Sequence, residues 1–357
     1  MLKKNFAYNL IYQFILIVTQ LITMPYISRV LGADNLGIYN YSYTTASYFL
    51  LFAMLGVANH GSRSIAKVQD DVEKRSATFW NIYLVQFIVA LFVLIIYILY
   101  VLVFVYDNKT IALVQTFVIL SGLFDINWFY FGIEKFKLTV TRNLLIKVST
   151  LCLIFIFVKE PKDLIVYTII NAVGWLVSQS VVWMFLRKYI RFKRASIQDS
   201  LENLKQMLIL FVPILAVSLY KYMDKIMLGI LSDYSQVAFY SNSESIISMP
   251  AVITTALGTV ALPRLSSLIQ KGQKNVSEHY IEISIQFSMF LACGMAFGLA
   301  AISDIFSNLY FGQGYEQCGT IILAFFPCVI FQAWASIIRM QFLLPYSHER
   351  VYIISMI

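Results

Sequence analysis

The stretch FWNIYLVQFIVALFVLIIYILYVLVFV, residues 79–105, contains no charged side chain. A run of about 20 apolar residues is long enough to cross a bilayer as an α-helix, and hydrocarbon satisfies no exposed backbone polar group. Runs of this kind recur along the 357 residues, which are 59% hydrophobic and only 13% charged, against about 25% charged in soluble domains. The sequence therefore predicts an all-α, polytopic membrane helical bundle.

We expect ten complete spans and the start of an eleventh near Val351. They lie near residues 8–31, 38–58, 79–105, 111–133, 143–158, 163–186, 206–231, 237–262, 279–302 and 319–343. Cytoplasmic segments of membrane proteins carry an excess of Lys and Arg. With the N-terminus inside, 21 of the 27 Lys and Arg residues fall in inner segments and 4 in outer ones. The pattern predicts a cytoplasmic N-terminus.

The net charge of +8 then reflects topology and contact with anionic membrane lipids, not nucleic-acid binding. The four cysteines have no CxxC spacing and the three histidines lie far apart, so neither a disulfide framework nor a metal site is indicated. No GxxxxGK[ST] motif is present, so we expect no ATPase activity. No cofactor is predicted.

Two parts of the chain share a pattern. Residues 24–42, MPYISRVLGADNLGIYNYS, and residues 222–243, YMDKIMLGILSDYSQVAFYSNS, each end a span at Leu-Gly, pass a short acidic loop and enter an aromatic-rich span. Gly32 and Gly229 are 197 residues apart. Six predicted spans precede the second copy's first span, so both copies insert in the same orientation, as parallel repeats about a pseudo-twofold axis along the membrane normal.

The repeat predicts the domain organisation. We expect a six-helix transmembrane lobe at residues 1–186, a basic cytoplasmic linker at 187–205 and a second transmembrane lobe at 206–357. Continuing the repeat, the second copy reaches only the start of its fifth span. The second lobe is therefore expected to be truncated, with about four helices and part of a fifth.

Charged side chains inside spans are candidates for function, because a charge at mid-bilayer costs about 3 kcal/mol even on permissive scales. Lys221, Asp224 and Lys225 lie in the predicted span 206–231, and Lys221 shares a helical face with the other two. We expect this face to line a water-filled cleft. The alternative is that the lysines extend to the outer interface.

A second polar group lies in FDINWFYFGIEKFKLTVTRNLLIKV, residues 124–148. Asp125 falls inside span 111–133, with Trp128 and Gly132 expected on its face. Arg142 and Lys147 open the next span, so they can form ion pairs with Asp125 or with Glu134. These pairs either lock two helices together or leave a cationic patch facing an inner vestibule.

Other candidates carry a structural alternative of equal weight. Arg29, in the exit turn of the first span, is either an interface anchor or a substrate contact. Glu244 either pairs with Lys225 across helices or titrates during transport. Most tyrosines fit membrane interfaces, whereas Tyr39, Tyr41 and Tyr240 are candidates for stacking on sugars.

Four segments carry a family resemblance: PYISRVLGADNLGIYNYS, YFLLFAMLGVANHGSRSIAK, FDINWFYFGIEKFKLTVTRN and FVPILAVSLYKYMDKIMLGILS. They resemble the bacterial Wzx-type O-antigen and capsule repeat-unit flippases, in the polysaccharide transporter family of the multidrug/oligosaccharidyl-lipid/polysaccharide (MOP) superfamily. The most specific parts are Asp-x-x-Trp-x-x-x-Gly-x-Glu-x-Phe from Asp125 and Tyr-x-x-x-Asp-x-x-x-Leu-Gly from Tyr220.

The resemblance implies a MATE/MVF-like, two-lobed bundle in the bacterial inner membrane. It implies translocation of undecaprenyl-pyrophosphate-linked oligosaccharides by alternating access coupled to H⁺ or Na⁺, beside a polysaccharide polymerase and a chain-length regulator. Expected pyrophosphate and sugar contacts are Lys221, Lys225, Arg29, Arg142, Lys147, Tyr39 and Tyr220. Expected ion-coupling acids are Asp224, Asp125, Glu244 and Glu134.

Three alternatives remain. One is another transporter of the same superfamily, either a lipid II flippase or a multidrug/cation antiporter, although a cation exporter should have excess acids in its cleft. Another is a membrane glycosyltransferase or polymerase, which would need an acidic catalytic motif in a large outer loop, and no such loop is predicted. The third is an inactive, truncated copy.

Overall fold

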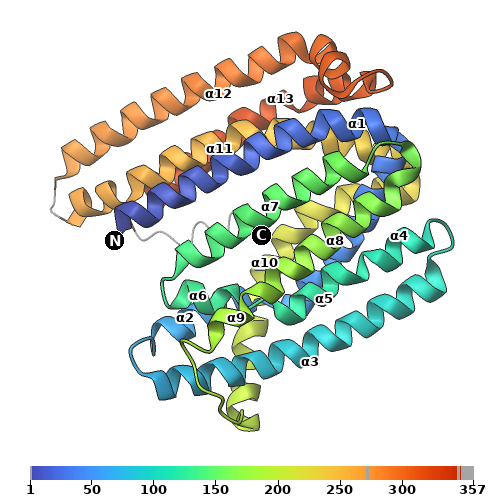
Figure 1. The fold of residues 1–357 in the computed structure, drawn as a ribbon. Helices are drawn as coiled ribbons and strands as arrows, with labels where there is room; N and C mark the ends of the chain where they lie inside the picture. Colours follow the sequence, from blue (N-terminus) through green and yellow to red (C-terminus); the bar gives the residue numbers. More distant parts are fainter. Residues whose placement is uncertain (1, 271–272, 344–345, 347–357) are drawn as a thin grey trace. The chain divides into compact units, whose positions relative to one another are not determined.

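A computed structural model describes residues 2–270, 273–343 and 346, and the secondary-structure elements in this part of the chain are helices (Figure 1). In chain order they are α1 (Leu2–Met54), α2 (Val57–Ala66), α3 (Val72–Phe104), α4 (Lys109–Val114), α5 (Thr116–Phe124), α6 (Asn127–Gly132), α7 (Phe136–Phe157), α8 (Leu164–Val181), α9 (Trp183–Leu186), α10 (Ile197–Leu231), α11 (Tyr234–Gln270), α12 (Lys274–Phe311) and α13 (Glu316–Ile337). A 3₁₀ turn, Pro161–Asp163, precedes α8, and a π-helical turn, Ile338–Leu343, follows α13. The all-α prediction is confirmed.

Among the described residues, seven helical segments are long and apolar enough to cross a membrane. They are Val72–Phe104, Lys109–Gly132, Phe136–Phe157, Pro161–Leu186, Ile197–Leu231, Asn275–Phe311 and Glu316–Leu343. The predicted span 8–31 and most of the predicted span 38–58 lie in α1, and 237–262 lies in α11. The span expected near Val351 lies outside the described residues. The chain is a multi-pass membrane protein.

The two Leu-Gly pairs of the sequence repeat have different roles in the structure. α1 is interrupted at Gly32, whose φ of 77° lies in the left-handed region that glycine tolerates. Gly229 instead stays helical within α10, and a Cβ atom there would lie 2.1 Å from the ring of Tyr41. The first glycine therefore allows a turn, and the second allows close packing of α10 on α1.

The predicted span 111–133 is not one continuous helix. It consists of α4, α5 and α6, with a break at Asp125, where φ is −76° and ψ is 98°. The Asp125 carboxylate accepts a hydrogen bond from the backbone N–H of Asn127 at 3.0 Å, an Asx-type turn that replaces helical bonding. Because of this break, Asp125 does not share a face with Trp128 and Gly132, which corrects the prediction.

The break leaves carbonyl groups at the end of α5 without helical partners, and side chains of neighbouring helices satisfy four of them in succession. Gln86 donates to the carbonyls of Gly122 and Asp125, both at 2.8 Å. The carbonyls between them, of residues 123 and 124, accept from Tyr83 at 3.2 Å and from Trp183 at 2.9 Å.

Gln86 itself is fully buried and makes a third hydrogen bond, since its Oε1 accepts from Trp128 Nε1 at 2.9 Å. The Trp128 ring also packs on α2, where a Cβ atom at Gly61 would lie 2.4 Å from it. It stacks on Phe79 of α3, with 5.3 Å between ring centroids. Gln86 and Trp128 thus join the broken helix to the core of α2, α3 and α6.

The span predicted at 143–158 begins earlier than expected. α7 starts at Phe136, so Arg142 lies inside the helix and does not open it. The polar residues of its first turns lowered the apparent hydropathy there. They are compatible with a membrane helix because Arg142 is buried within the protein.

The described chain packs into two compact units. Residues 2–19 and 34–235 form the first unit, and residues 20–33 with the described part of 236–357 form the second unit. α10 packs against α2 and α3 and belongs to the first unit. The lobes predicted at residues 1–186 and 206–357 were inferred from the sequence repeat and not from compactness. That division stays a prediction.

Residues 20–33 of α1 are held within the second unit by hydrogen bonds. Pro25 has no N–H to donate to the Leu21 carbonyl, and the Tyr310 hydroxyl donates to it instead at 2.8 Å. Ser28 accepts from Tyr315 at its carbonyl, 3.2 Å away, and from Asn242 at its hydroxyl, 3.3 Å away. This helical segment therefore packs as part of the second unit.

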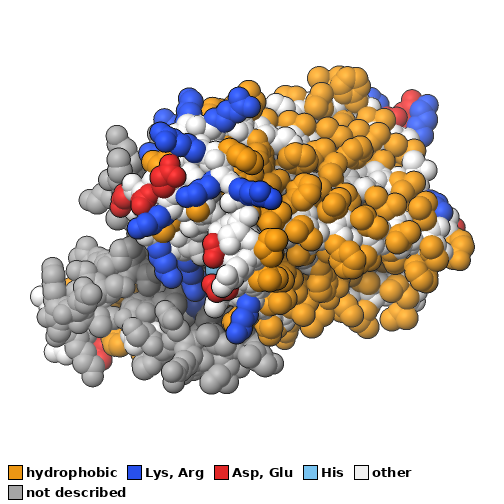
Figure 2. Space-filling model, turned by 90° about the horizontal axis from the view of Figure 1, so that it is seen from below, with side chains coloured by type: hydrophobic (Ala, Val, Ile, Leu, Met, Phe, Trp, Pro, Cys, Tyr) orange, Lys and Arg blue, Asp and Glu red, His pale blue; other side chains and the backbone are white. Residues whose placement is uncertain are grey.

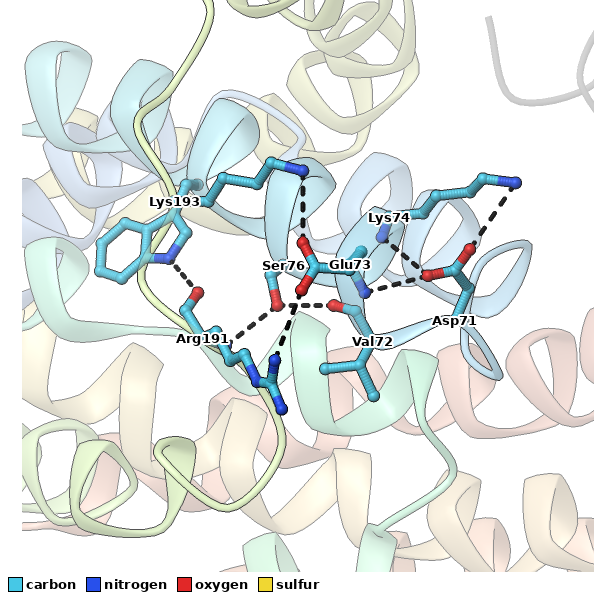
Figure 3. A network of polar contacts seen from close by, with 8 residues as sticks. Asp71, Val72, Glu73, Lys74, Ser76, Arg191 and Lys193 are labelled. Atoms are coloured by element: carbon cyan, nitrogen blue, oxygen red, sulfur yellow. Dashed lines mark hydrogen bonds and ion pairs between the residues drawn. The ribbon is translucent and has the colours of Figure 1, made fainter.

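The basic segment before α10 is fastened to the start of α3 (Figure 3). The Arg191 N–H donates to Ser76 at 3.0 Å, and the Arg191 carbonyl accepts from Trp80 at 3.0 Å. Arg191 and Lys193 also pair with Glu73 at 3.7 and 3.6 Å, but exposed ion pairs of this kind contribute little. The backbone hydrogen bonds therefore set the path of this segment.

Asp71 caps the same end of α3. Its carboxylate accepts from the backbone N–H groups of Lys74 at 3.1 Å and Glu73 at 2.9 Å. These hydrogen bonds, together with the nearby Lys74 ammonium, lower the pKa of Asp71. The cap is therefore charged at neutral pH, which favours it at a helix N-terminus.

The surface separates basic and apolar regions, as expected for a membrane protein. In Figure 2, Lys and Arg side chains gather mostly at one end of the visible face, and hydrophobic side chains cover a broad area beside them. On α3 the exposed apolar residues include Ile88, Phe92, Ile95 and Leu99. Such a surface is suited to contact with lipid acyl chains.

We predict that Gln86→Leu lowers the free energy of unfolding by about 3 kcal/mol or more, because each buried polar group left unsatisfied costs about 1–3 kcal/mol. Two carbonyls and the Trp128 indole would lose their partner. Thermal unfolding of the purified protein in detergent measures the effect. Phe87→Leu, at an exposed neighbouring position, is the control. Equal melting temperatures for both variants would contradict this role of Gln86.

Candidate polar cavity in the first unit

A polar cavity of about 380 Å³ lies within the first unit, between the α5–α6 break, α7 and α8. Its volume is within the range of ligand pockets, roughly 300–1,000 Å³. The lining residues are Asp125, Asn127, Arg142, Asn143, Ile146, Lys147, Thr150, Asn171, Gly174, Trp175, Ser178 and Gln179. Most of them are polar, although all three helical segments are membrane spans.

A chain of hydrogen bonds forms one wall of the cavity. The Asn127 side-chain amide donates to Asp125 at 2.7 Å and to Gln179 at 2.9 Å. Its oxygen accepts from the Arg142 guanidinium at 3.0 Å. Asn127 therefore bridges a carboxylate and a guanidinium on different helical segments, which reduces the cost of burying both.

Arg142 is further held by its neighbour on α7. Its Nε and Nη2 atoms donate to the Asn143 side-chain oxygen at 3.1 and 2.5 Å, and Ser178 of α8 donates to the same oxygen at 3.3 Å. These contacts fix a planar, permanently charged group at the edge of the cavity.

Lys147 follows Arg142 by five residues on α7, about 1.4 helical turns, and also lines the cavity. Within the described part of the chain, its ammonium has no hydrogen bond or ion pair to another residue. With Asp125, Arg142 and Lys147, the cavity contains two cations and one carboxylate. An excess of positive charge, with an ammonium not used for internal packing, favours an anionic occupant.

The remaining wall offers neutral hydrogen-bonding groups and an aromatic ring. Thr150, Asn171 and Ser178 contribute hydroxyl or amide groups, which both donate and accept. Trp175 is exposed and presents an amphipathic ring from α8. Together with the cations, this set suits a polyhydroxylated, negatively charged molecule.

The structure brings three predicted residues together in this cavity: Asp125, Arg142 and Lys147. Arg142 and Asp125 are connected through Asn127, as the hydrogen bonds above describe. Glu134 does not line the cavity. It lies in the turn before α7 with a positive φ of 58° and an exposed side chain.

The predicted group on α10 lies elsewhere. The Lys221 ammonium is 5.5 Å from the centroid of the Tyr222 ring, and Lys221, Asp224 and Tyr220 are all exposed. Lys225 is half-buried. None of these residues lines the polar cavity, and their roles in substrate binding or ion coupling stay predictions.

The predicted residues Arg29 and Glu244 belong to the second unit. The Arg29 side chain donates to the Leu309 carbonyl at 2.5 Å and lies against Gly312, so it supports the turn after α12. Glu244 is half-buried on α11. Neither observation tests a role of Arg29 or Glu244 in transport.

The tyrosines considered for sugar stacking pack against other rings. Tyr39 is buried in the first unit, where its centroid is 4.6 Å from that of Tyr167 and 5.8 Å from that of Tyr43. The ring centroid of Tyr41 lies 5.6 Å from that of Tyr234. Sugar stacking by these rings stays a prediction, while Trp175 is an aromatic residue that sequence reasoning missed.

Other cavity residues were missed as well, although the sequence contains a signal for them. On α8, Asn171, Trp175, Ser178 and Gln179 have the spacing i, i+4, i+7 and i+8, which places them on one helical face. A polar stripe in a membrane helix indicates a face that is turned away from lipid.

These features define a class: a polytopic, all-α membrane protein with a polar, positively charged cavity among its spanning helices. The chain belongs to the polysaccharide biosynthesis protein family, whose sequence profile matches residues 2–269. The resemblance to polysaccharide transporters is thereby confirmed.

Two relatives carry the name "Putative O-antigen transporter". The protein from Escherichia coli (strain K12) is 23% identical over 356 residues, covering 98% of this chain and 85% of the relative. The protein from Shigella dysenteriae is 23% identical over 340 residues, covering 92% and 83%.

A solved structure shows the same fold. It is an inward-facing multidrug resistance transporter of the MATE family, in the MOP superfamily, with a TM-score of 0.63 and 14% identity. The similarity covers 95% of this chain and 83% of that one. The predicted MATE-like fold is confirmed.

We predict unequal effects on stability for substitutions of the two cations of the cavity. Arg142→Lys should lower the free energy of unfolding by about 1–3 kcal/mol, because an ammonium cannot reproduce the planar contacts to two amides. Lys147→Gln should change it by less than about 0.5 kcal/mol, since it removes no internal partner. Thermal unfolding in detergent measures both. A larger loss for Lys147→Gln than for Arg142→Lys would refute the described geometry.

Proposed function

We propose that this protein is a flippase that moves a lipid-linked oligosaccharide across the bacterial cytoplasmic membrane for polysaccharide synthesis. The observation that carries the proposal is the polar cavity in the first unit. Its amides, hydroxyls and exposed Trp175 suit a sugar, while Arg142 and Lys147 suit a phosphate or another anionic group. The names of the relatives from Escherichia coli and Shigella dysenteriae support the same substrate class.

The physical problem in such transport is the polar part of the substrate. A pyrophosphate or a sugar cannot enter hydrocarbon without replacement of its hydration. Hydrogen-bonding side chains within the bundle provide that replacement, while an undecaprenyl tail stays in apolar surroundings. We infer that movement follows alternating access, with the cytoplasmic side marked by the basic segment that contains Arg191 and Lys193.

Asp125 is our candidate for ion coupling. Its carboxylate is connected to Arg142 through Asn127, so binding of H⁺ or Na⁺ at the carboxylate would alter the charge balance that holds the guanidinium. The coupling ion would thereby change the position of a substrate-binding cation. Lys221, Lys225, Asp224 and Glu244 remain second candidates in this proposal, for binding and coupling respectively.

A multidrug transporter is the competing function, because the solved structure with a similar fold is that of a multidrug resistance transporter. The charges in the cavity argue against it. Two cations and one carboxylate would repel a cationic drug, whereas they attract a phosphate or a uronic acid.

We predict that Lys147→Gln reduces polysaccharide export about tenfold or more, since a hydrogen bond to a charged group contributes about 1.5–3 kcal/mol. The measurement is surface polysaccharide in a strain that lacks its own flippase and expresses this protein. Lys109→Gln, a cation of the first unit outside the cavity, is the control. Normal export by Lys147→Gln at equal expression would rule out the cavity as the substrate path.

We also predict the orientation of the chain. In a cysteine-free background, Lys188→Cys should resist a membrane-impermeant thiol reagent added to intact cells, because residue 188 is expected to be cytoplasmic. Lys109→Cys should react, because residue 109 is expected outside. The reverse labelling pattern would overturn the topology.

A further inference from the structure

A second cavity, of about 710 Å³, lies in the first unit beside the polar one. It is a groove along α7, α8 and α9. The lining residues are Glu134, Lys135, Lys137, Leu138, Thr141, Arg142, Leu145, Ile146, Val177, Val181, Phe185 and Tyr189. We call it the apolar groove, because Leu138, Leu145, Val177, Val181 and Phe185 form most of its walls.

The apolar groove and the polar cavity share a boundary. Arg142 and Ile146 line both of them. α8 contributes to both as well: Val177 and Val181 line the groove, while Ser178 and Gln179 line the polar cavity. Two cavities of opposite chemical character therefore meet at a buried guanidinium.

The charged residues that line the apolar groove carry more positive than negative charge. Lys135 and Lys137 line the groove together with Arg142, against the single carboxylate of Glu134. Lys137 and Arg142 are five residues apart on α7, about 7.5 Å along its axis at 1.5 Å per residue. An anionic group in the apolar groove would thus share it with three cations, one carboxylate and a mainly apolar lining.

We propose that the apolar groove seats the hydrocarbon chain of a polyprenyl phosphate lipid, with its phosphate at Arg142, Lys135 and Lys137. The sugar attached to that phosphate would enter the polar cavity. The proposal rests on the proposed function, since it divides that substrate between two sites. Its basis is that three regions of the protein adjoin one another: the apolar groove, the boundary at Arg142 and the hydrogen-bonding polar cavity. The hydrocarbon, phosphate and sugar of the lipid follow one another in the same order.

A membrane phospholipid is the obvious competitor for an apolar groove. Its hydrocarbon and phosphate would satisfy the groove and the cations, but a small headgroup would leave the polar cavity without a ligand. A glycosylated polyprenyl phosphate has a large polar part on the far side of the phosphate. This match to both cavities selects it as the occupant.

The experiment measures lipid binding to the full chain by native mass spectrometry, with undecaprenyl phosphate, undecaprenol and phosphatidylglycerol as probes. We expect undecaprenyl phosphate to bind at least about tenfold more tightly than phosphatidylglycerol. Val177→Trp, which fills the groove, should weaken undecaprenyl phosphate and undecaprenol alike. Leu153→Trp, at an exposed position of α7 outside the groove, is the matched control.

Charge is tested separately. Lys137→Gln should weaken undecaprenyl phosphate by about tenfold and leave undecaprenol unchanged, because only the phosphate interacts with the ammonium. Leu145→Trp fills the groove from a second exposed position. It replaces Val177→Trp in the binding measurement if Val177→Trp lowers the melting temperature. Equal binding of phosphatidylglycerol and undecaprenyl phosphate, or equal effects of Val177→Trp and Leu153→Trp, would overturn the proposal.

The two proposals fail in distinguishable ways. If undecaprenyl phosphate binds as described but the protein supports no polysaccharide export in a flippase-deficient strain, the proposed function is wrong and the lipid site stands. If export is normal and Val177→Trp changes neither binding nor export, the groove assignment is wrong and the function stands.

Discussion

The structure of the first unit depends on how it satisfies the exposed carbonyls at the end of α5. A membrane helix cannot end in hydrocarbon without partners for its last carbonyls. Here Tyr83 and Gln86 of α3 and Trp183 of α9 supply donors to four successive carbonyls. Because these donors hold the break open, Asp125 is released from the helix and turns toward α7 and α8. The polar cavity exists because the helix is broken at this residue.

The break also explains how charge is tolerated in the membrane region. Asn127, the first residue of α6, bridges the Asp125 carboxylate and the Arg142 guanidinium. Arg142 in turn lies between the polar cavity and the apolar groove. One local departure from helical geometry therefore places two bridged charges and two cavities next to each other. In the proposed function, this is the position where the head of a lipid-linked sugar would be held.

Much of the fold could be predicted from sequence, because an apolar run such as residues 79–105 is stable in a bilayer as a membrane-spanning α-helix. The break at Asp125 could not, since the side chains that donate to its carbonyls lie 36 to 59 residues away in sequence. The same limit applies to the site. Asp125, Arg142 and Lys147 can be picked out in the sequence as charges in an apolar region. Gln86 and Gln179 are neutral, and their roles become visible only from their hydrogen-bond partners in the structure. The start of α7 was missed because polar residues such as Lys137 and Arg142 lower the hydropathy of its first turns.

The most direct test of this account is an experimental structure of the protein in a lipid nanodisc with a lipid-linked oligosaccharide bound. The account predicts sugar density between α7 and α8, within hydrogen-bonding distance of Lys147 and beside Trp175, with a phosphate next to Arg142. Density for the sugar at another place, with the cavity between α7 and α8 filled only by water, would contradict it.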